Sequence, residues 1–476
     1  MSISQLYEEN DGLGLAEHVR KGSVSPEELL DEAIGRTVKW NPRIGAVVVH
    51  HHEYAREQIR QGLPEGSFRG VPFLLKDLVA QLKDTETSNG SRFFSGRIAD
   101  QNSTVVERYL ATGVTIFGKT SCPELGLSGA SDPVLYGPTR NPWDLQLSAG
   151  GSSGGAAAAV AAGIVPIAHA SDGGGSIRVP ASVCGLVGLK PSRARIPSGP
   201  LRGESWAGLS SHHVVTRSVR DCAAMLDATA GAEAGDPYQV LPPERPFLEE
   251  VARHPKQLVI GINLNRIDGT PADPDVIEAL MDVAKLLESL GHRVESYKSP
   301  AVAEEVSKHF GSILLSHVNV TLSLREQELG RAVTENDVER LTWFLYQGGR
   351  DLPATEYVKA TFYFHKLGRQ MAKLHEKFDL VLGPTCTVPA MPLGLVNMNG
   401  DIAAHTEALR QFVPSICTSN MTGQPSMSLP LSWSPKGIPI GSMFTAPLGG
   451  EAVLFQLAGQ LEQARPWKDR RPSFPL

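Results

Sequence analysis

The chain has 476 residues, an ordinary globular composition and a formal net charge of −6 at pH 7. This negative charge and the lack of a basic run argue against a nucleic-acid-binding surface. Five cysteines without metal-type spacing indicate reduced thiols and a cytoplasmic setting. The apolar runs are too short to span a membrane, and the first residues lack the basic and apolar regions of a signal peptide.

The N-terminal third predicts alternating helices and strands. Ser25 can cap a helix, the proline after it suits the first helical turn, and Glu28 completes a capping box. The apolar run Gly70–Leu75 predicts a buried strand that ends in Lys76. Burial lowers the pKa of a lysine and lets it act as a base, although pairing with a neighbouring carboxylate is the alternative. Further elements are expected as strands over 44–49 and 114–117 and helices over 53–61 and 103–112.

Three short motifs resemble sites of other protein classes. Gly113–Thr120 has the spacing of a phosphate-binding P-loop, but β-branched residues between its glycines would leave phosphate without a backbone cradle. Gly150–Gly154 has the pattern of the α/β-hydrolase nucleophile elbow, but residues 141–146 before it are predicted as a loop instead of an apolar strand. His50–His52 lacks further ligands at metal-site spacing, so a solvated strand end is favoured there.

A glycine-rich run from Ser148 to Pro191 contains two serine sites, Ser152–Ser153 and Ser176. The glycines at 173–175 directly precede Ser176, and their bare backbone N–H groups suit an oxyanion hole. A serine on such a loop is a candidate nucleophile, but it needs a base to take its proton. No His–Asp pair is evident nearby, so Lys76 is the candidate base.

The rest of the chain predicts an α/β sheet. A strand, a helix and a strand over 258–262, 273–290 and 294–297 favour parallel pairing. Further helices are expected over 156–162, 218–230, 302–328, 335–347, 354–377 and 451–461, and further strands over 164–168, 379–382, 426–429 and 438–443.

Several motifs in order along nearly the whole chain resemble the amidase-signature family. The matching segments are 70–78, 118–125, 137–144, 150–155, 171–180, 185–191, 423–430 and 437–441. The resemblance implies an α/β fold, with one large domain whose mixed, twisted β-sheet core is covered by helices on both faces. This domain would span residues 1–476, with an N-terminal helical portion at 1–65, the signature core at 66–230 and a less similar portion for substrate specificity at 250–476.

The resemblance also implies a role for each site residue. Ser176 would be the acylated nucleophile, Ser152 would sit on a cis peptide bond and relay the proton, and Lys76 would be the terminal base. The oxyanion hole would comprise the backbone N–H groups of Gly173, Gly174, Gly175 and Ser176, and the supporting residues would be Ser153, Ser171, Asp172 and Arg178. This chemistry needs neither a metal nor an organic cofactor.

Two of these positions depart from the family pattern. Ser171 stands where the family usually has threonine, and it keeps the hydroxyl group. Gly173 stands where the family usually has a larger residue, which should loosen the oxyanion loop or make room for a bulky acyl group. The second departure bears on the substrate class more than on the mechanism.

The expected activity is hydrolysis of a carbon–nitrogen amide bond through a serine acyl-enzyme. Within the family, the chain most resembles bacterial amidases that open cyclic amide oligomers, including 6-aminohexanoate cyclic-dimer hydrolases; linear amides, anilides and carbamates are neighbouring substrates. The expected partners are a small-molecule amide and a second copy in a homodimer, with neither nucleic acid nor membrane. Two alternatives stay open: the glutaminase-type component of a tRNA-dependent amidotransferase, and a nucleotide-binding module at Gly113–Thr120.

Overall fold

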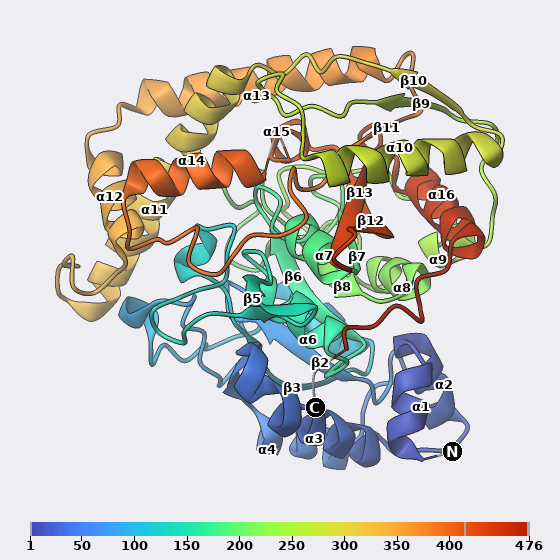
Figure 1. Cartoon of the computed structure of the whole chain (residues 1–476). Coiled ribbons are helices and arrows are strands. Elements are labelled where there is room, and N and C mark those ends of the chain that lie inside the picture. The colour runs from blue at the N-terminus through green and yellow to red at the C-terminus, as the bar shows by residue number, and fades with distance from the viewer. Residues whose placement is uncertain (1, 414–415, 474–476) are drawn as a thin grey trace.

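A mixed sheet of eleven strands runs through the centre of the computed structural model, which describes residues 2–413 and 416–473 (Figure 1). Its strand order is β1-β3-β2-β6-β8-β7-β12-β13-β11-β9-β10, and β4 and β5 form a separate pair. The strands are β1 (Val47–His50), β2 (Pro72–Lys76), β3 (Thr115–Thr120), β4 (Arg140–Asn141), β5 (Asp144–Ser148), β6 (Ile167–Asp172), β7 (Val187–Lys190), β8 (Ser211–Thr216), β9 (Val259–Ile262), β10 (Arg293–Ser296), β11 (Leu380–Pro384), β12 (Ser426–Trp433) and β13 (Pro439–Thr445).

The sheet contains both parallel and antiparallel pairings, grouped in blocks. Strand β2 pairs in parallel with both β3 and β6, and β9 pairs in parallel with both β10 and β11. The middle strands from β6 to β13 pair antiparallel. The predicted parallel pairing of strands 258–262 and 294–297 is therefore confirmed, and so is the α/β fold with a mixed sheet.

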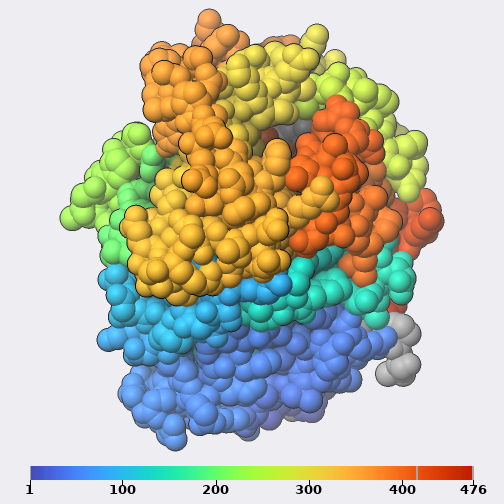
Figure 2. Space-filling model, turned by 90° about the vertical axis from the view of Figure 1, so that its left-hand side faces the viewer, coloured from blue at the N-terminus to red at the C-terminus, as the bar shows by residue number. Residues whose placement is uncertain are grey.

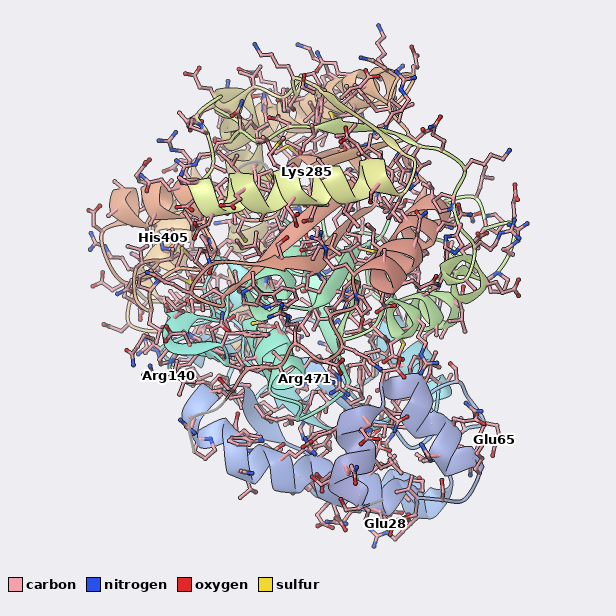
Figure 3. The ribbon with its side chains drawn as sticks, turned by 45° about the vertical axis from the view of Figure 1, so that its right-hand side comes forward. Glu28, Glu65, Arg140, Lys285, His405 and Arg471 are labelled. Carbon is pink, nitrogen blue, oxygen red and sulfur yellow. The ribbon has the colours of Figure 1, made fainter. Side chains whose placement is uncertain are left out.

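Helices pack around this sheet, with the N-terminal ones at one end of the molecule and α10 to α14 at the other (Figure 1). Figure 3 places Glu28 at the first end and Lys285 on α10 at the second. The helices are α1 (Ile3–Glu9), α2 (Gly12–Arg20), α3 (Pro26–Ile44), α4 (His52–Gln61), α5 (Thr104–Ala111), α6 (Gly154–Ala161), α7 (Arg178–Cys184), α8 (Val219–Thr229), α9 (Phe247–Val251), α10 (Pro274–Ser289), α11 (Ala303–Leu329), α12 (Arg340–Arg350), α13 (Ala354–Leu374), α14 (Ile402–Phe412), α15 (Thr418–Thr422) and α16 (Glu451–Ala464).

Local signals place most helix starts correctly, and the misplaced elements have local causes. The predicted capping box at Ser25 and Glu28 is present. Strand 44–49 begins later, at Val47, because α3 runs on to Ile44 and ends at Gly45 in the left-handed conformation. The helix predicted over 335–347 starts later as well, as α12.

Two predictions in the signature core, one of a strand and one of a loop, are wrong in detail. Strand 164–168 lies further along, as β6, because the Ile164 N–H still bonds to Ala159 O and closes α6. The loop expected over 141–146 contains the β4–β5 hairpin, whose exposed Asp144 and Gln146 alternate with less exposed residues. This short polar strand still differs from the apolar strand that a nucleophile elbow requires.

Strand β3 shows why the P-loop spacing is accidental. The strand continues through the second glycine to Thr120, so the backbone there forms ladder hydrogen bonds with β1 and β2. A Cβ atom on Gly118 would lie 2.5 Å from Val49 O, so this glycine permits close strand packing. The segment therefore has no phosphate-binding loop.

Helices α11, α12 and α13 form a cap with apolar clusters of its own. One cluster joins Leu322 of α11 to Phe93, Phe94 and Leu125 of the signature core. A second cluster joins α11 to α13, and Trp206 packs against both clusters. In Figure 2 the yellow and orange surface of this cap rests directly on the blue and cyan surface of the N-terminal part.

The described residues carry further information on thiols, membranes and metals. All five cysteines are free. Within residues 2–413 and 416–473, no helix combines the length and the apolar character needed to cross a bilayer. In the same residues, no group of three or more His, Cys, Asp or Glu side chains gathers where it could hold a metal ion.

Candidate active site

Strand β2 delivers Lys76 into the interior. All five of its residues are buried, and Lys76 Nζ donates hydrogen bonds to Ser152 Oγ at 2.7 Å and to Ser171 Oγ at 3.1 Å. Burial lowers the pKa of Lys76 to about 8, against smaller raising effects from Cys122 and Asp172. The amine thus loses its proton far more readily than an ordinary lysine does.

The two serine segments lie side by side at this amine. The peptide bond between Gly151 and Ser152 is cis. The backbone N–H of Ser153 donates to Ser176 O at 3.3 Å, and Ser153 Oγ donates to Ser171 O at 3.2 Å. These bonds connect the loop before α6, the end of β6 and the loop after β6. Lys76 and the four serines are therefore neighbours in space, although they are far apart in the sequence.

The tri-glycine loop presents several backbone N–H groups, but one of them differs from the prediction. The Gly175 N–H donates to Asp172 Oδ1 at 2.7 Å, so it is already engaged and falls outside the set of open donors. The N–H groups of Gly173, Gly174 and Ser176 have no hydrogen-bond partner among the described residues. These three amides remain available to an oxyanion.

Asp172 and Arg178 form a fully buried ion pair beneath this loop. Arg178 Nε and Nη2 each donate to an Asp172 carboxylate oxygen at 2.9 Å. The guanidinium of Arg178 holds the pKa of Asp172 well below its usual range, despite the opposing effect of burial. Arg178 also donates to Ile416 O, Ser419 Oγ and Asn420 Oδ1, which ties the C-terminal segment to the tri-glycine loop.

Asn420 is a site residue that the sequence analysis missed. Its side-chain Nδ2 donates to Asp172 Oδ1 at 2.9 Å, to Asp172 O at 3.0 Å and to Leu209 O at 3.0 Å. One amide group thus joins Asp172, next to the tri-glycine loop, to the segment before β8. No local pattern around Asn420 signals this role, because its partners are more than 200 residues away in the chain.

Ser131 was missed as well. Its Oγ donates to Gly150 O at 3.1 Å and to Ser152 O at 3.3 Å, and it accepts the Gly154 N–H at 3.0 Å. It thereby holds the backbone on both sides of the serine pair. The hydroxyl group of a loop serine is too common a feature to indicate such a role.

A pair of buried histidines lies behind Lys76. His169 Nδ1 accepts the Lys76 backbone N–H at 3.2 Å, and His169 Nε2 lies 3.1 Å from His212 Nδ1. Burial lowers the pKa of both rings, to about 4 for His212, so both are neutral at pH 7 and place no competing positive charge beside the amine. The two-residue period of a strand could have indicated that His169 lies near Lys76, since His169 and Ser171 share one face of β6.

A cavity of about 410 Å³ adjoins the site. Leu125 and Leu127 line the cavity, and a Cβ atom on Gly126 between them would lie 3.3 Å from Ser152 Oγ, so this segment neighbours the serine pair. Trp206 forms another part of the wall, next to Gly173. Much of the lining is apolar and includes Phe94, Leu125, Leu127, Val318 and Leu324.

Comparison with known proteins decides the family. A family model described as Amidase matches residues 28–455. The chain belongs to the amidase family. This amidase is a hydrolase of carbon–nitrogen amide bonds, and the matches favour that function over a glutaminase-type amidotransferase component or a nucleotide-binding module.

Three relatives align with this chain over almost their entire length. A 6-aminohexanoate-cyclic-dimer hydrolase from Paenarthrobacter ureafaciens is 36% identical to this amidase, over 97% of this chain and 96% of that protein. The solved structure of a 6-aminohexanoate cyclic dimer hydrolase matches with a TM-score of 0.91 and 33% identity, over 98% of this chain and 99% of the other. A bacterial aryl acylamidase matches with a TM-score of 0.88 and 26% identity, over 98% and 99% of the two chains.

Proposed function

We propose that this amidase cleaves a small-molecule amide through an acyl-enzyme on Ser176, with Ser152 as the proton relay and Lys76 as the base. The observation that carries the proposal is the 2.7 Å hydrogen bond between Lys76 Nζ and Ser152 Oγ in the buried interior. The lowered pKa of the amine supports the role of base. Ser171 at 3.1 Å from Lys76 Nζ supports the orientation of the amine.

In the first step, neutral Lys76 accepts the proton of Ser152, and Ser152 accepts the proton of Ser176. Ser176 Oγ then bonds to the amide carbonyl carbon, and the N–H groups of Gly173, Gly174 and Ser176 stabilise the resulting oxyanion. The tetrahedral intermediate collapses, the carbon–nitrogen bond breaks, and the relay returns one proton to the leaving amine. Water, deprotonated by the same relay, then adds to the ester carbonyl carbon. The bond from that carbon to Ser176 Oγ breaks, the relay returns the proton to Ser176, and the acid leaves.

The substrate class we propose is a small neutral amide, either a cyclic or linear amide oligomer or an anilide. Relatives named as a 6-aminohexanoate-cyclic-dimer hydrolase and an aryl acylamidase support this class. The apolar part of the cavity lining supports it too, because methylene chains and aryl rings lose water favourably there. Residues 250–476 supply part of that lining, in keeping with their predicted part in specificity.

A homodimer in the cytoplasm is part of the same proposal. The five free thiols support a reducing compartment. Sedimentation of the purified protein tests the dimer, and a monomer at all concentrations would contradict it.

A fluorophosphonate probe tests the acyl-enzyme directly. We expect the probe to add once to the intact protein, and peptide mapping to place the added mass on Ser176. Ser289, an exposed serine on α10, serves as the internal control and should stay unmodified. A probe found on Ser152, or an unmodified protein that still cleaves amides, would contradict Ser176 as the nucleophile.

The pH dependence tests Lys76. Its pKa of about 8 in the folded protein means that the amine is mostly protonated below that pH and unable to act as a base. We expect kcat/KM to fall tenfold per pH unit below about pH 8, to about 100-fold below its plateau near pH 6. A rate that stays level between about pH 6 and pH 9 would contradict the role.

A second buried lysine provides the control for this profile. Burial also lowers the pKa of Lys119 to about 8, but its Nζ donates to Glu86 O and Thr87 Oγ1 instead of to a catalytic serine. The Lys119→Met variant should therefore keep the same acidic limb. If the limb disappeared in this variant, the titration would belong to Lys119.

A further inference from the structure

The Trp206 indole fills the space that a side chain at position 173 would occupy. A Cβ atom built on Gly173 would lie 2.8 Å from Cε3 and 3.0 Å from Cζ3 of the Trp206 indole. Such distances are well inside the contact distance of two carbon atoms. The space beside the oxyanion loop is therefore filled by an indole from another segment, and a side chain at position 173 would displace it.

The indole is held in a fixed relation to the oxyanion loop. Trp206 has a left-handed backbone with a φ of 54°, and its carbonyl accepts the Leu209 N–H at 3.0 Å. The carbonyl of Leu209 in turn accepts Asn420 Nδ2 at 3.0 Å, and the same Nδ2 donates to Asp172. The tryptophan turn and the loop that carries Ser176 are thus bonded to one amide group.

A second aromatic ring completes this surface. A Cβ atom on Gly174 would lie 2.8 Å from Cζ of Phe310, on α11. The Trp206 and Phe310 rings meet edge to face, with centroids 6.4 Å apart. The half-buried indole also lines the cavity, whose wall includes Leu125 and Leu127 on either side of Gly126, a neighbour of Ser152. Trp206 and Phe310 therefore lie against the two glycines whose open N–H groups would meet the carbonyl oxygen of an amide.

We propose that Trp206 determines acyl specificity, with Gly173 as its size-complementary partner, and that the pair selects amides of extended apolar or aromatic acids. The inference rests on the proposed acyl-enzyme. The acyl group is the part of the substrate that stays bonded to Ser176 after the amine leaves. A wall built onto the oxyanion loop can therefore contact that group in both chemical steps.

The first test removes the indole. The substrates are the 4-nitroanilides of acetate, hexanoate and benzoate, which share one leaving group and differ in the acid. We expect the preference of kcat/KM for hexanoyl and benzoyl over acetyl to fall about tenfold in Trp206→Ala, because the wall they contact is gone. Trp433, at the end of β12, is outside the cavity lining, so Trp433→Ala should leave the preference unchanged.

Two results of this test would overturn the assignment. One is an equal loss for all three acids. The other is a loss that is larger for acetate than for hexanoate and benzoate, because the wall would then not contact the extended acids.

The second test uses the shared space. Gly173 has no left-handed backbone requirement, so Gly173→Ala changes only the space next to the indole. We expect this variant to lose activity at least about tenfold, because the new methyl group pushes the indole or the oxyanion amides out of place. Adding Trp206→Ala should restore part of the lost activity. A double variant that is less active than Gly173→Ala would overturn the size-complementary pair.

The outcomes separate this inference from the proposed function. If the wild-type protein takes the fluorophosphonate probe on Ser176 but Trp206→Ala has the same acyl preference as the wild type, the role of Trp206 alone is refuted. Failure of the probe to react with Ser176 refutes the acyl-enzyme, and the acyl specificity falls with it.

Discussion

Replacing Ser176 by alanine is expected to lower kcat by at least about 10³-fold, the scale seen when serine hydrolases lose their nucleophile. The reason is chemical, because no acyl-enzyme can form without the hydroxyl group. The loop itself should persist, since its hydrogen bonds to Asp172 come from the backbone of Gly175 and Ile177. Steady-state hydrolysis of a 4-nitroanilide, together with a thermal melt, measures both properties.

The relay predicts a further pattern in the same assay. If Ser152 and Ser176 act as one unit, the double alanine variant should be about as slow as the slower single variant, because the second loss removes nothing more. Ser289→Ala, an exposed substitution on α10, is the matched control and should retain full activity. Near-normal turnover by Ser176→Ala would refute the nucleophile.

Replacing Asp172 by alanine is expected to destabilise the protein by about 3–5 kcal/mol, the usual cost of leaving a buried charge unpaired. Arg178 would stay in the interior without its counter-charge, since both side chains are fully buried. The Gly175 and Ile177 N–H groups would lose their acceptor as well, so the oxyanion loop would shift. Urea unfolding at pH 7 measures the free energy, and kcat should fall together with it.

An exposed ion pair gives the control. Asp31 meets Arg56 at 2.7 Å on the surface, and Asp31→Ala should cost less than about 1 kcal/mol. If Asp172→Ala fails to fold, Asp172→Asn keeps the shape of the side chain, and its own urea midpoint should still fall well below that of the control. Equal costs for the Asp172 and Asp31 substitutions would contradict the buried pair as a support of the loop.

The same pair contributes to the acid stability of the fold. The pKa of Asp172 lies far below its unfolded value of about 3.9, so the carboxylate stabilises the folded state at neutral pH. That stabilisation is lost progressively as the pH falls from about 3.9 toward the folded pKa.

Elements with strong local signals were predictable. The capping box at Ser25, the buried strand that ends in Lys76 and the helix opened by Asp273 each depend on a few consecutive residues. The boundaries of an element were less predictable where residues after a helix still form hydrogen bonds back to that helix. The start of β6 is an example, because Ile164 still bonds back to α6.

Sequence alone determined the family and the segments that meet around Lys76, because these motifs are contiguous and ordered along the chain. The tertiary structure alone decided that the Gly175 amide is engaged and that Asn420 and Trp206 adjoin the oxyanion loop. The physical reason is distance along the chain. Asn420 bonds to a carboxylate 248 residues away, and the Trp206 indole occupies a space that is free because residue 173 is a glycine without a side chain. Such contacts arise only when segments far apart in the chain pack together, and no local pattern encodes them.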